Sequence, residues 1–168
     1  MSEQQDTGPL GDLPVPLRTL NGRPLFIMNV TVSDIHAAGG PPGAERRIAH
    51  VSGGAFVGER LSGTILPGGV DWLTASGDGA TLLDARLALR TDDGAVIGMG
   101  FSGIRHGPAH VIARVNAGEE VDPADYYFRT LPRFTTSAPR YEWLNRILAV
   151  GIGQRLASGP VYSVFEIL

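Results

Sequence analysis

The strongest chemical signal in the chain is an acid beside a tryptophan at the end of the glycine-rich segment 53–72. Asp71 follows a Pro-Gly-Gly turn at residues 67–69 and directly precedes Trp72, whose ring could shield the carboxylate from water. Loss of water raises the pKa of a carboxyl group toward values that suit a general base. Alternatively, Asp71 caps the turn through backbone hydrogen bonds, a common role of aspartate. The sequence leaves both interpretations open.

A second group of charged residues alternates with leucine and alanine in residues 80–91. In a strand, Asp84, Arg86 and Arg90 share one face because alternate residues point the same way. A later strand is expected to place Arg129 and Tyr127 nearby. If that face lines a cavity, Asp84 moves a proton and the three arginines hold a carboxylate or a developing enolate. The alternative is a solvated outer face, where most charged residues lie.

Aromatic and polar residues supply further candidates for substrate binding. Trp72, Tyr127 and Trp143 are predicted to shape the substrate and exclude water, although packing in a core explains most aromatic clusters equally well. His106 is a candidate proton carrier near neutral pH, or an ordinary loop residue beside a Gly-Pro pair. Asn145 is a further candidate for substrate binding.

The motifs for metals and cofactors are missing from the sequence. The chain has no cysteine, which excludes disulfides and thiolate ligands. His106 and His110 are separated by Gly107-Pro108, which disfavours a helix through both, so no metal site is expected. The glycine-rich segments lack the Lys-Ser/Thr ending of a phosphate loop, and residues 151–153 lack the rest of a dinucleotide fingerprint. No cofactor is therefore expected.

Length and composition point to one globular domain. The chain has 168 residues, of which 43% are hydrophobic, enough to bury a core without disulfides. A net charge of -3 offers no broad basic field for nucleic acid. No apolar run reaches the length of a membrane helix. The polar N-terminus, with Glu3 and Asp6, does not resemble a secretion signal, so a cytoplasmic location is expected.

The residues that position these side chains are predicted to be strands. Prolines make residues 1–24 a flexible arm, and residues 25–168 are expected to form one domain. Strands are predicted at 25–32, 46–51, 60–66, 80–91 and 96–101 from their alternating pattern. Gly53-Gly54 is expected to separate two of them. Residues 37–44 are predicted as a loop, and tight turns are predicted at 76–79 and 92–94.

The last third of the chain completes an all-β fold. Residues 108–118 carry the one expected helix, which is short and lies between a proline and a glycine. Three aromatic and β-branched runs, at 126–134, 145–152 and 161–167, bring the total to roughly eight or nine strands. This number is compatible with closure into a single antiparallel β-barrel.

Several blocks of the chain, from about residue 25 to the C-terminus, resemble the bacterial and fungal family called domain of unknown function 3237. They are Gly53-Gly54 with Phe56 and Gly58; Leu66-Pro67-Gly68-Gly69 with Asp71-Trp72; Leu83-Asp84-Ala85-Arg86 with Leu89-Arg90-Thr91-Asp92-Asp93-Gly94; Gly103 with Arg105-His106-Gly107-Pro108; Tyr126-Tyr127-Phe128-Arg129-Thr130 with Pro132-Arg133-Phe134; and Tyr141 with Trp143-Leu144-Asn145-Arg146. The resemblance implies a small barrel, similar to calycins or allene oxide cyclase, with a central cavity open at one end. It implies no particular reaction.

Three hypotheses for function follow from these residues. The first is a cofactor-independent isomerase, cyclase or lyase acting on a small carbonyl-bearing or polyketide-like molecule, with Asp71 or Asp84 moving the proton and the arginines steadying negative charge. The second is a non-catalytic barrel that binds a small hydrophobic ligand as a carrier or sensor. The third is an oligomer-building module, because open strand edges would permit a homo-oligomer.

Overall fold

The computed structural model describes residues 11–168, and residues 1–10 of the predicted arm lie outside the described residues. The rest of the arm contains α1 (Val15–Arg18), a single turn that buries none of its side chains and that the sequence did not predict. The first strand begins at Gly22, slightly before the expected start at residue 25. Within residues 11–168, no helix is long and apolar enough to cross a membrane.

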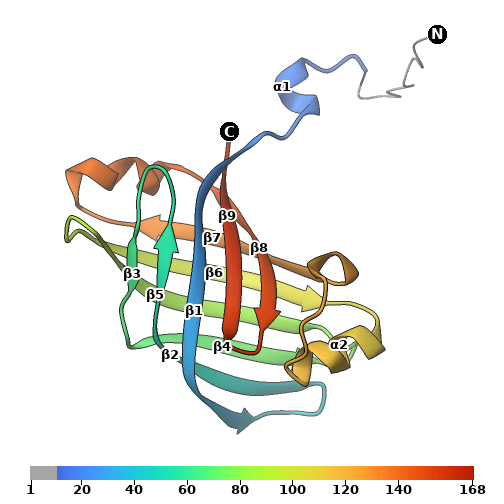
Figure 1. Cartoon of the computed structure of the whole chain (residues 1–168). Coiled ribbons are helices and arrows are strands. Elements are labelled where there is room, and N and C mark those ends of the chain that lie inside the picture. The colour runs from blue at the N-terminus through green and yellow to red at the C-terminus, as the bar shows by residue number, and fades with distance from the viewer. Residues whose placement is uncertain (1–10) are drawn as a thin grey trace.

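The described residues form nine strands, eight of which close into an antiparallel barrel (Figure 1). The strands are β1 (Gly22–Gly39), β2 (Ala44–Val57), β3 (Gly63–Ile65), β4 (Gly69–Ser76), β5 (Thr81–Thr91), β6 (Val96–His106), β7 (Tyr127–Thr135), β8 (Ala149–Leu156) and β9 (Gly159–Ile167). The ring runs β1-β9-β8-β7-β6-β5-β4-β2 and returns to β1, while β3 pairs with β2 and β5. The predicted all-β barrel is confirmed, and the predicted helix at 108–118 is α2 (Ala109–Asn116).

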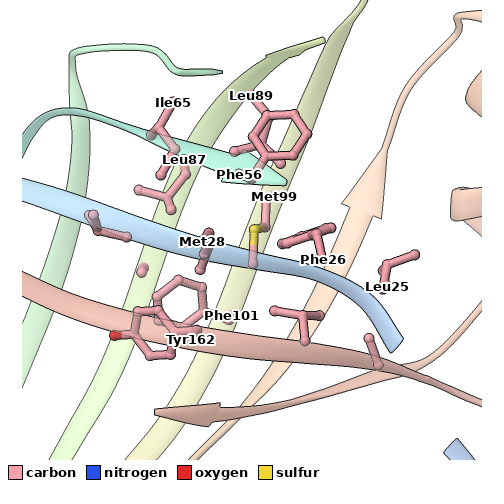
Figure 2. Close-up of a cluster of buried hydrophobic side chains, with 14 of the residues drawn as sticks. Leu25, Phe26, Met28, Phe56, Ile65, Leu87, Leu89, Met99, Phe101 and Tyr162 are labelled. Atoms are coloured by element: carbon pink, nitrogen blue, oxygen red, sulfur yellow. The ribbon is translucent and has the colours of Figure 1, made fainter. Parts of the chain in front are cut away.

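The core fills the inside of the barrel because each strand turns its apolar residues inward. In β5, buried and non-buried positions alternate along the strand, with Leu83, Ala85, Leu87 and Leu89 inside. Figure 2 shows Leu87 and Leu89 packed in one cluster with inward side chains of other strands, among them Met28 and Phe101. Burial of a large apolar side chain contributes roughly 1.5–3 kcal/mol. This inner layer therefore fixes which face of every strand meets the interior.

Of two predicted breaks in the first hairpin, the loop is present but shorter than expected, and the break at Gly53-Gly54 is wrong. Pairing between β1 and β2 continues to Gly39 opposite Arg46, so the predicted loop at 37–44 is much shorter. β2 also runs unbroken through Gly53 and Gly54, where a register shift bends the strand. Gly54 has a φ of 136°, and a Cβ atom there would overlap the carbonyl oxygen of Asn29. The two glycines therefore bend one strand and do not separate two.

The predicted turns are confirmed, but the strand predicted at 60–66 shortens to β3, residues 63–65. Gly79 and Gly94 each lie in a tight turn with a φ near 90°, at 87° and 88°, a conformation that glycine adopts without strain. The 3-10 helix η3 (Pro139–Arg146) lies at one end of the barrel and α2 at the other (Figure 1). A shorter 3-10 turn, η2 (Pro123–Asp125), precedes β7. We refer below to the α2 end and the η3 end.

Candidate functional site

A small cavity lies inside the barrel toward the α2 end. Its volume is about 60 Å³. Four polar residues from four strands line it: Asp71 of β4, Arg105 of β6, Arg155 of β8 and Tyr162 of β9. The other lining residues are apolar: Val30, Val32, Ile35, Ala49, Val51, Leu73, Leu83, Ala85, Leu87, Phe101 and Pro160. Few polar groups on an apolar wall are typical of a small-molecule site.

Asp71 is the acid of this cavity. It sits on the inner face of β4, and its Oδ1 accepts a hydrogen bond from the backbone N–H of Asp84 at 3.2 Å. Burial raises the pKa of Asp71 to about 6, and the charge of Asp84 acts in the same direction. The backbone hydrogen bond and the charge of Arg105 oppose this shift. Asp71 is therefore mostly ionised at neutral pH yet takes up a proton readily.

Arg105 and Arg155 bring positive charge to the same cavity. Burial lowers the pKa of Arg105, and the neighbouring charges of Arg155 and Arg47 lower it further. Arg105 donates a hydrogen bond to Oδ1 of Asn116, at the end of α2, at 3.1 Å. The backbone N–H of Arg155 donates to the hydroxyl of Tyr126 at 2.9 Å. Both arginines are thus tied to structure outside the cavity that they line.

Tyr162 forms part of the cavity wall. Its ring packs against Phe101 and Phe128, at centroid distances of 5.6 Å and 5.4 Å. Figure 2 shows its hydroxyl pointing away from the labelled apolar side chains. Burial raises the pKa of Tyr162, and the charge of Asp71 raises it further. Tyr162 therefore stays neutral and offers a hydroxyl, a hydrogen-bond donor and acceptor.

Trp72 does not shield Asp71, contrary to expectation. Consecutive residues of a strand point to opposite faces, so Trp72 lies on the outer face and is 46% exposed. The aliphatic interior of the barrel supplies the burial that shifts the pKa of Asp71. The sequence drew attention to Asp71 because it precedes Trp72, but the Trp72 ring is not what raises the pKa of Asp71.

The charged face of β5 also points outward, so the premise that it lines the barrel cavity is wrong. Asp84 and Arg86 form an ion pair at 2.7 Å with side chains 65% and 73% exposed, and Arg90 is exposed as well. The apolar residues of β5 occupy the interior, which leaves the alternate positions to solvent. Asp84 and Arg86 instead border an outer hollow of about 490 Å³.

Three other predicted residues gather on the outer surface. His106 stacks on Tyr127 with ring centroids 5.1 Å apart, and the guanidinium of Arg129 lies 4.8 Å from the Tyr127 ring. They border a surface cleft of about 330 Å³. Arg129 also donates to the backbone oxygen of Phe128 at 3.0 Å. The structure brings these residues together, but not with Asp71.

The last two predicted residues lie in η3, at the other end of the barrel. The side chain of Asn145 accepts from the backbone N–H of Thr136 at 2.9 Å and donates to its carbonyl at 2.8 Å. Trp143 packs beneath the guanidinium of Arg60 at 3.9 Å. These contacts fix the chain after β7. Among the described residues, no cluster of three or more His, Asp and Glu is placed to hold a metal ion.

Sequence reasoning missed Arg105, Arg155 and Tyr162. A signal for all three exists in the alternation of the inner face. Arg105 continues the inward series Met99-Phe101-Gly103, and Arg155 continues the inward series Ala149-Gly151-Gly153. Tyr162 precedes inward Val164 by two residues. Where the inward positions of a strand are apolar and the last of them is charged, the interior of the barrel becomes polar at that end of the strand.

Fold and site together define a closed antiparallel β-barrel with a small, partly polar cavity at one end. The chain belongs to the family described as Protein of unknown function (DUF3237), whose model matches residues 21–167. A curated relative from Rhodopseudomonas palustris, a UPF0311 protein, is 39% identical over 150 residues, covering 89% of this chain and 98% of the relative.

Solved structures of similar proteins share the barrel. A conserved protein of unknown function from Rhodopseudomonas palustris matches with a TM-score of 0.86 and 39% identity, covering 89% of this chain and 99% of that one. A β-barrel-like protein from Acinetobacter baumannii matches with a TM-score of 0.78 and 36% identity, covering 89% and 97%. A structure described as an enzyme from Penicillium herquei matches with a TM-score of 0.71, covering 95% and 100%, at 24% identity, a likeness of fold alone.

Proposed function

We propose that this protein is a cofactor-independent enzyme of the isomerase, cyclase or lyase kind that acts on a small carbonyl compound in the barrel cavity. One observation carries the proposal: a shielded acid, Asp71, shares a small apolar cavity with two arginines. A base with a pKa near the working pH and a fixed positive charge are the two requirements for moving a proton next to a carbonyl.

The proposed step begins with ionised Asp71. Its carboxylate removes a proton from the carbon next to the carbonyl, and the electron pair of the C–H bond moves onto the carbonyl oxygen as an enolate. Arg105 and Arg155 stabilise that negative charge in a site of low dielectric. Collapse of the enolate then re-forms the carbonyl in one of three ways. Its carbon takes the proton from Asp71 in a new C–H bond, or attacks a second carbonyl carbon and closes a ring while that carbonyl's oxygen takes the proton, or expels a leaving group that takes the proton.

The size of the cavity favours a small substrate. A volume of about 60 Å³ has room for only a few water molecules. It favours a small carbonyl compound, whereas a polyketide ring system would have to remain at the mouth. Asp71, Arg105 and Arg155 are each only partly buried, so the cavity communicates with solvent. Of the two substrate types expected from the sequence, the small carbonyl compound fits better.

The test is exchange of carbon-bound hydrogen in heavy water, because it detects proton removal even when no product accumulates. A panel of small ketones, aldehydes and 2-oxo acids would be followed by proton NMR. We expect the wild type to exchange hydrogen next to the carbonyl of at least one compound, and Asp71→Asn to slow this by about 10²- to 10⁴-fold. The matched control is Asp92→Asn, an exposed acid in the β5–β6 turn.

Equal exchange by wild type and Asp71→Asn would remove Asp71 from the mechanism. Absence of exchange with every compound would favour the second candidate, a carrier or sensor for a small hydrophobic ligand. That candidate is supported by the lining of the cavity, in which apolar residues outnumber polar ones.

A further inference from the structure

The arginines around the cavity form no ion pair within residues 11–168. Five ion pairs join described residues, and none of them includes Arg47, Arg105 or Arg155. Asp71 is the one carboxylate that lines the cavity. Arg47 is a further positive charge near Arg105. With Asp71 ionised, Arg105 and Arg155 themselves still leave one positive charge uncompensated. With Asp71 protonated, they leave two.

Arg105 also has an unused donor. Its Nε atom is buried and makes no hydrogen bond within the described chain. A buried N–H on a charged group is costly to leave unpaired, whereas an acceptor brought by a ligand satisfies it. The neighbouring charges of Arg155 and Arg47, which disfavour the charged form of Arg105, would be offset by the same ligand. A bound anion would therefore both accept a hydrogen bond from Nε of Arg105 and reduce the repulsion among the neighbouring arginines.

We propose that the cavity binds its substrate through a carboxylate, so that the natural substrate is a small carboxylic acid held by Arg105 and Arg155. Arginine matches a carboxylate because its planar donors can form two parallel hydrogen bonds. The carboxylate's single negative charge offsets part of the excess positive charge that Arg105, Arg155 and Arg47 leave beside ionised Asp71. A dianion such as phosphate loses more hydration on entering an apolar cavity.

This inference rests on the proposed function, since it names the substrate class of the same cavity. It is nevertheless measured by binding and not by turnover. Asp71 repels the anion at neutral pH, so Asp71→Asn is expected to bind a carboxylate more tightly although it has lost the proton-transfer step. If carboxylate binding holds while hydrogen exchange fails, the proposed enzymatic function is wrong and the binding site stands.

The experiment compares propionate with propionamide, which has nearly the same shape but no charge. The full chain at pH 7 would be titrated with each and followed by amide NMR shifts. We expect propionate to bind at least tenfold more tightly than propionamide, and more tightly than inorganic phosphate. Asp71→Asn should tighten propionate binding about fivefold, the effect of removing one nearby like charge.

Charge-removing variants locate the site. Arg105→Gln and Arg155→Gln should each weaken propionate binding at least tenfold and leave propionamide unaffected. Arg133→Gln is the matched control, since Arg133 lies exposed on the outer face of β7. If Arg105→Gln does not fold, Arg155→Gln and the wild-type preference for propionate decide the question. Equal affinity for propionate and propionamide, tighter binding of phosphate, or full binding by Arg155→Gln would overturn the proposal.

Discussion

Burial of the ionised Asp71 carboxylate lowers the stability of the folded protein. Its pKa is raised by burial from 3.8 to about 6, so the folded protein holds a proton that the unfolded chain releases. As pH rises from about 4 to about 6, the unfolded state loses that proton first, and the free energy of unfolding falls. Above about pH 6, the free energy of unfolding is reduced by the full cost of burying the charged carboxylate. Such a cost is expected at a site kept for chemistry.

Substitution of Asp71 by asparagine should therefore stabilise the protein. Asparagine keeps the oxygen that accepts from the Asp84 N–H but carries no charge. A shift of this size corresponds to up to about 3 kcal/mol, and partial exposure of the side chain reduces the expected gain to about 2 kcal/mol at pH 8. Urea unfolding at pH 4 and pH 8 measures it, with Asp92→Asn as the control.

The expected signature of Asp71→Asn is a gain that grows with pH and nearly vanishes at pH 4. A gain that is equal at both pH values would instead reflect packing or hydrogen bonding. No gain at pH 8 would contradict the burial of a charged Asp71.

At the scale of elements, one bent strand closes the barrel. β2 pairs with β1 along its length, with β4 over its first half and with β3 near its end, so it must bend between partners. Gly54 lies at this bend, and its positive φ and contact with β1 leave no space for a side chain. Glycine is required here for close approach as much as for backbone freedom.

Gly54→Ala is expected to cost more than about 3 kcal/mol, because it combines a strained φ with overlap against Asn29. The matched control is Gly68→Ala. Gly68 also has a positive φ, 101°, but a Cβ atom there would meet nothing within 4 Å. Its cost should be about 1–2 kcal/mol, the strain alone. Urea unfolding at pH 7 compares the two, and equal losses would show that close packing of β1 and β2 at Gly54 is unimportant.

At the scale of the molecule, the two ends of the barrel differ in how their charges are paired. At the η3 end, buried Glu166 accepts hydrogen bonds from Arg23 and Arg60, which tie β1 and the segment before β3 to β9. Asp93 likewise accepts from Arg140 and Tyr141. At the α2 end, no ion pair among residues 11–168 includes the inward arginines. The η3 end therefore has its charges paired within the fold, and the α2 end carries the charge that we propose a ligand balances.

The sequence predicted the barrel well because its signals are local. Alternation in residues 80–91, the tight turns around Gly79 and Gly94, and the short helix depend on neighbours in the chain. The site was predicted only in part, since it depends on which face of each strand turns inward. The sequence left open whether Asp84 and Arg86 face the cavity or solvent, and the leucines that alternate with them occupy the interior. Which residues of a strand face inward depends on how the side chains of all the strands in the ring pack together.

The alternation of each strand marks Arg105 and Arg155 as inward-facing, but it does not show that they share one cavity. Each is one arginine at the end of a strand, and only closure of the ring brings them to the cavity that Asp71 also lines. Trp143 and Asn145 were predicted to bind substrate from their residue types. Their contacts instead hold η3 in place, at the other end of the barrel.

The central claim is that Asp71 is a shielded acid inside the barrel, and its titration tests this most directly. Carbon-13 NMR of the aspartate carboxyl groups would be followed from pH 3 to pH 8, with the Asp71 signal assigned by its loss in Asp71→Asn. The structure predicts a pKa of about 6. A pKa near the ordinary value of 3.8 would contradict the account, because Asp71 would then be a solvated side chain without a role as a shielded base.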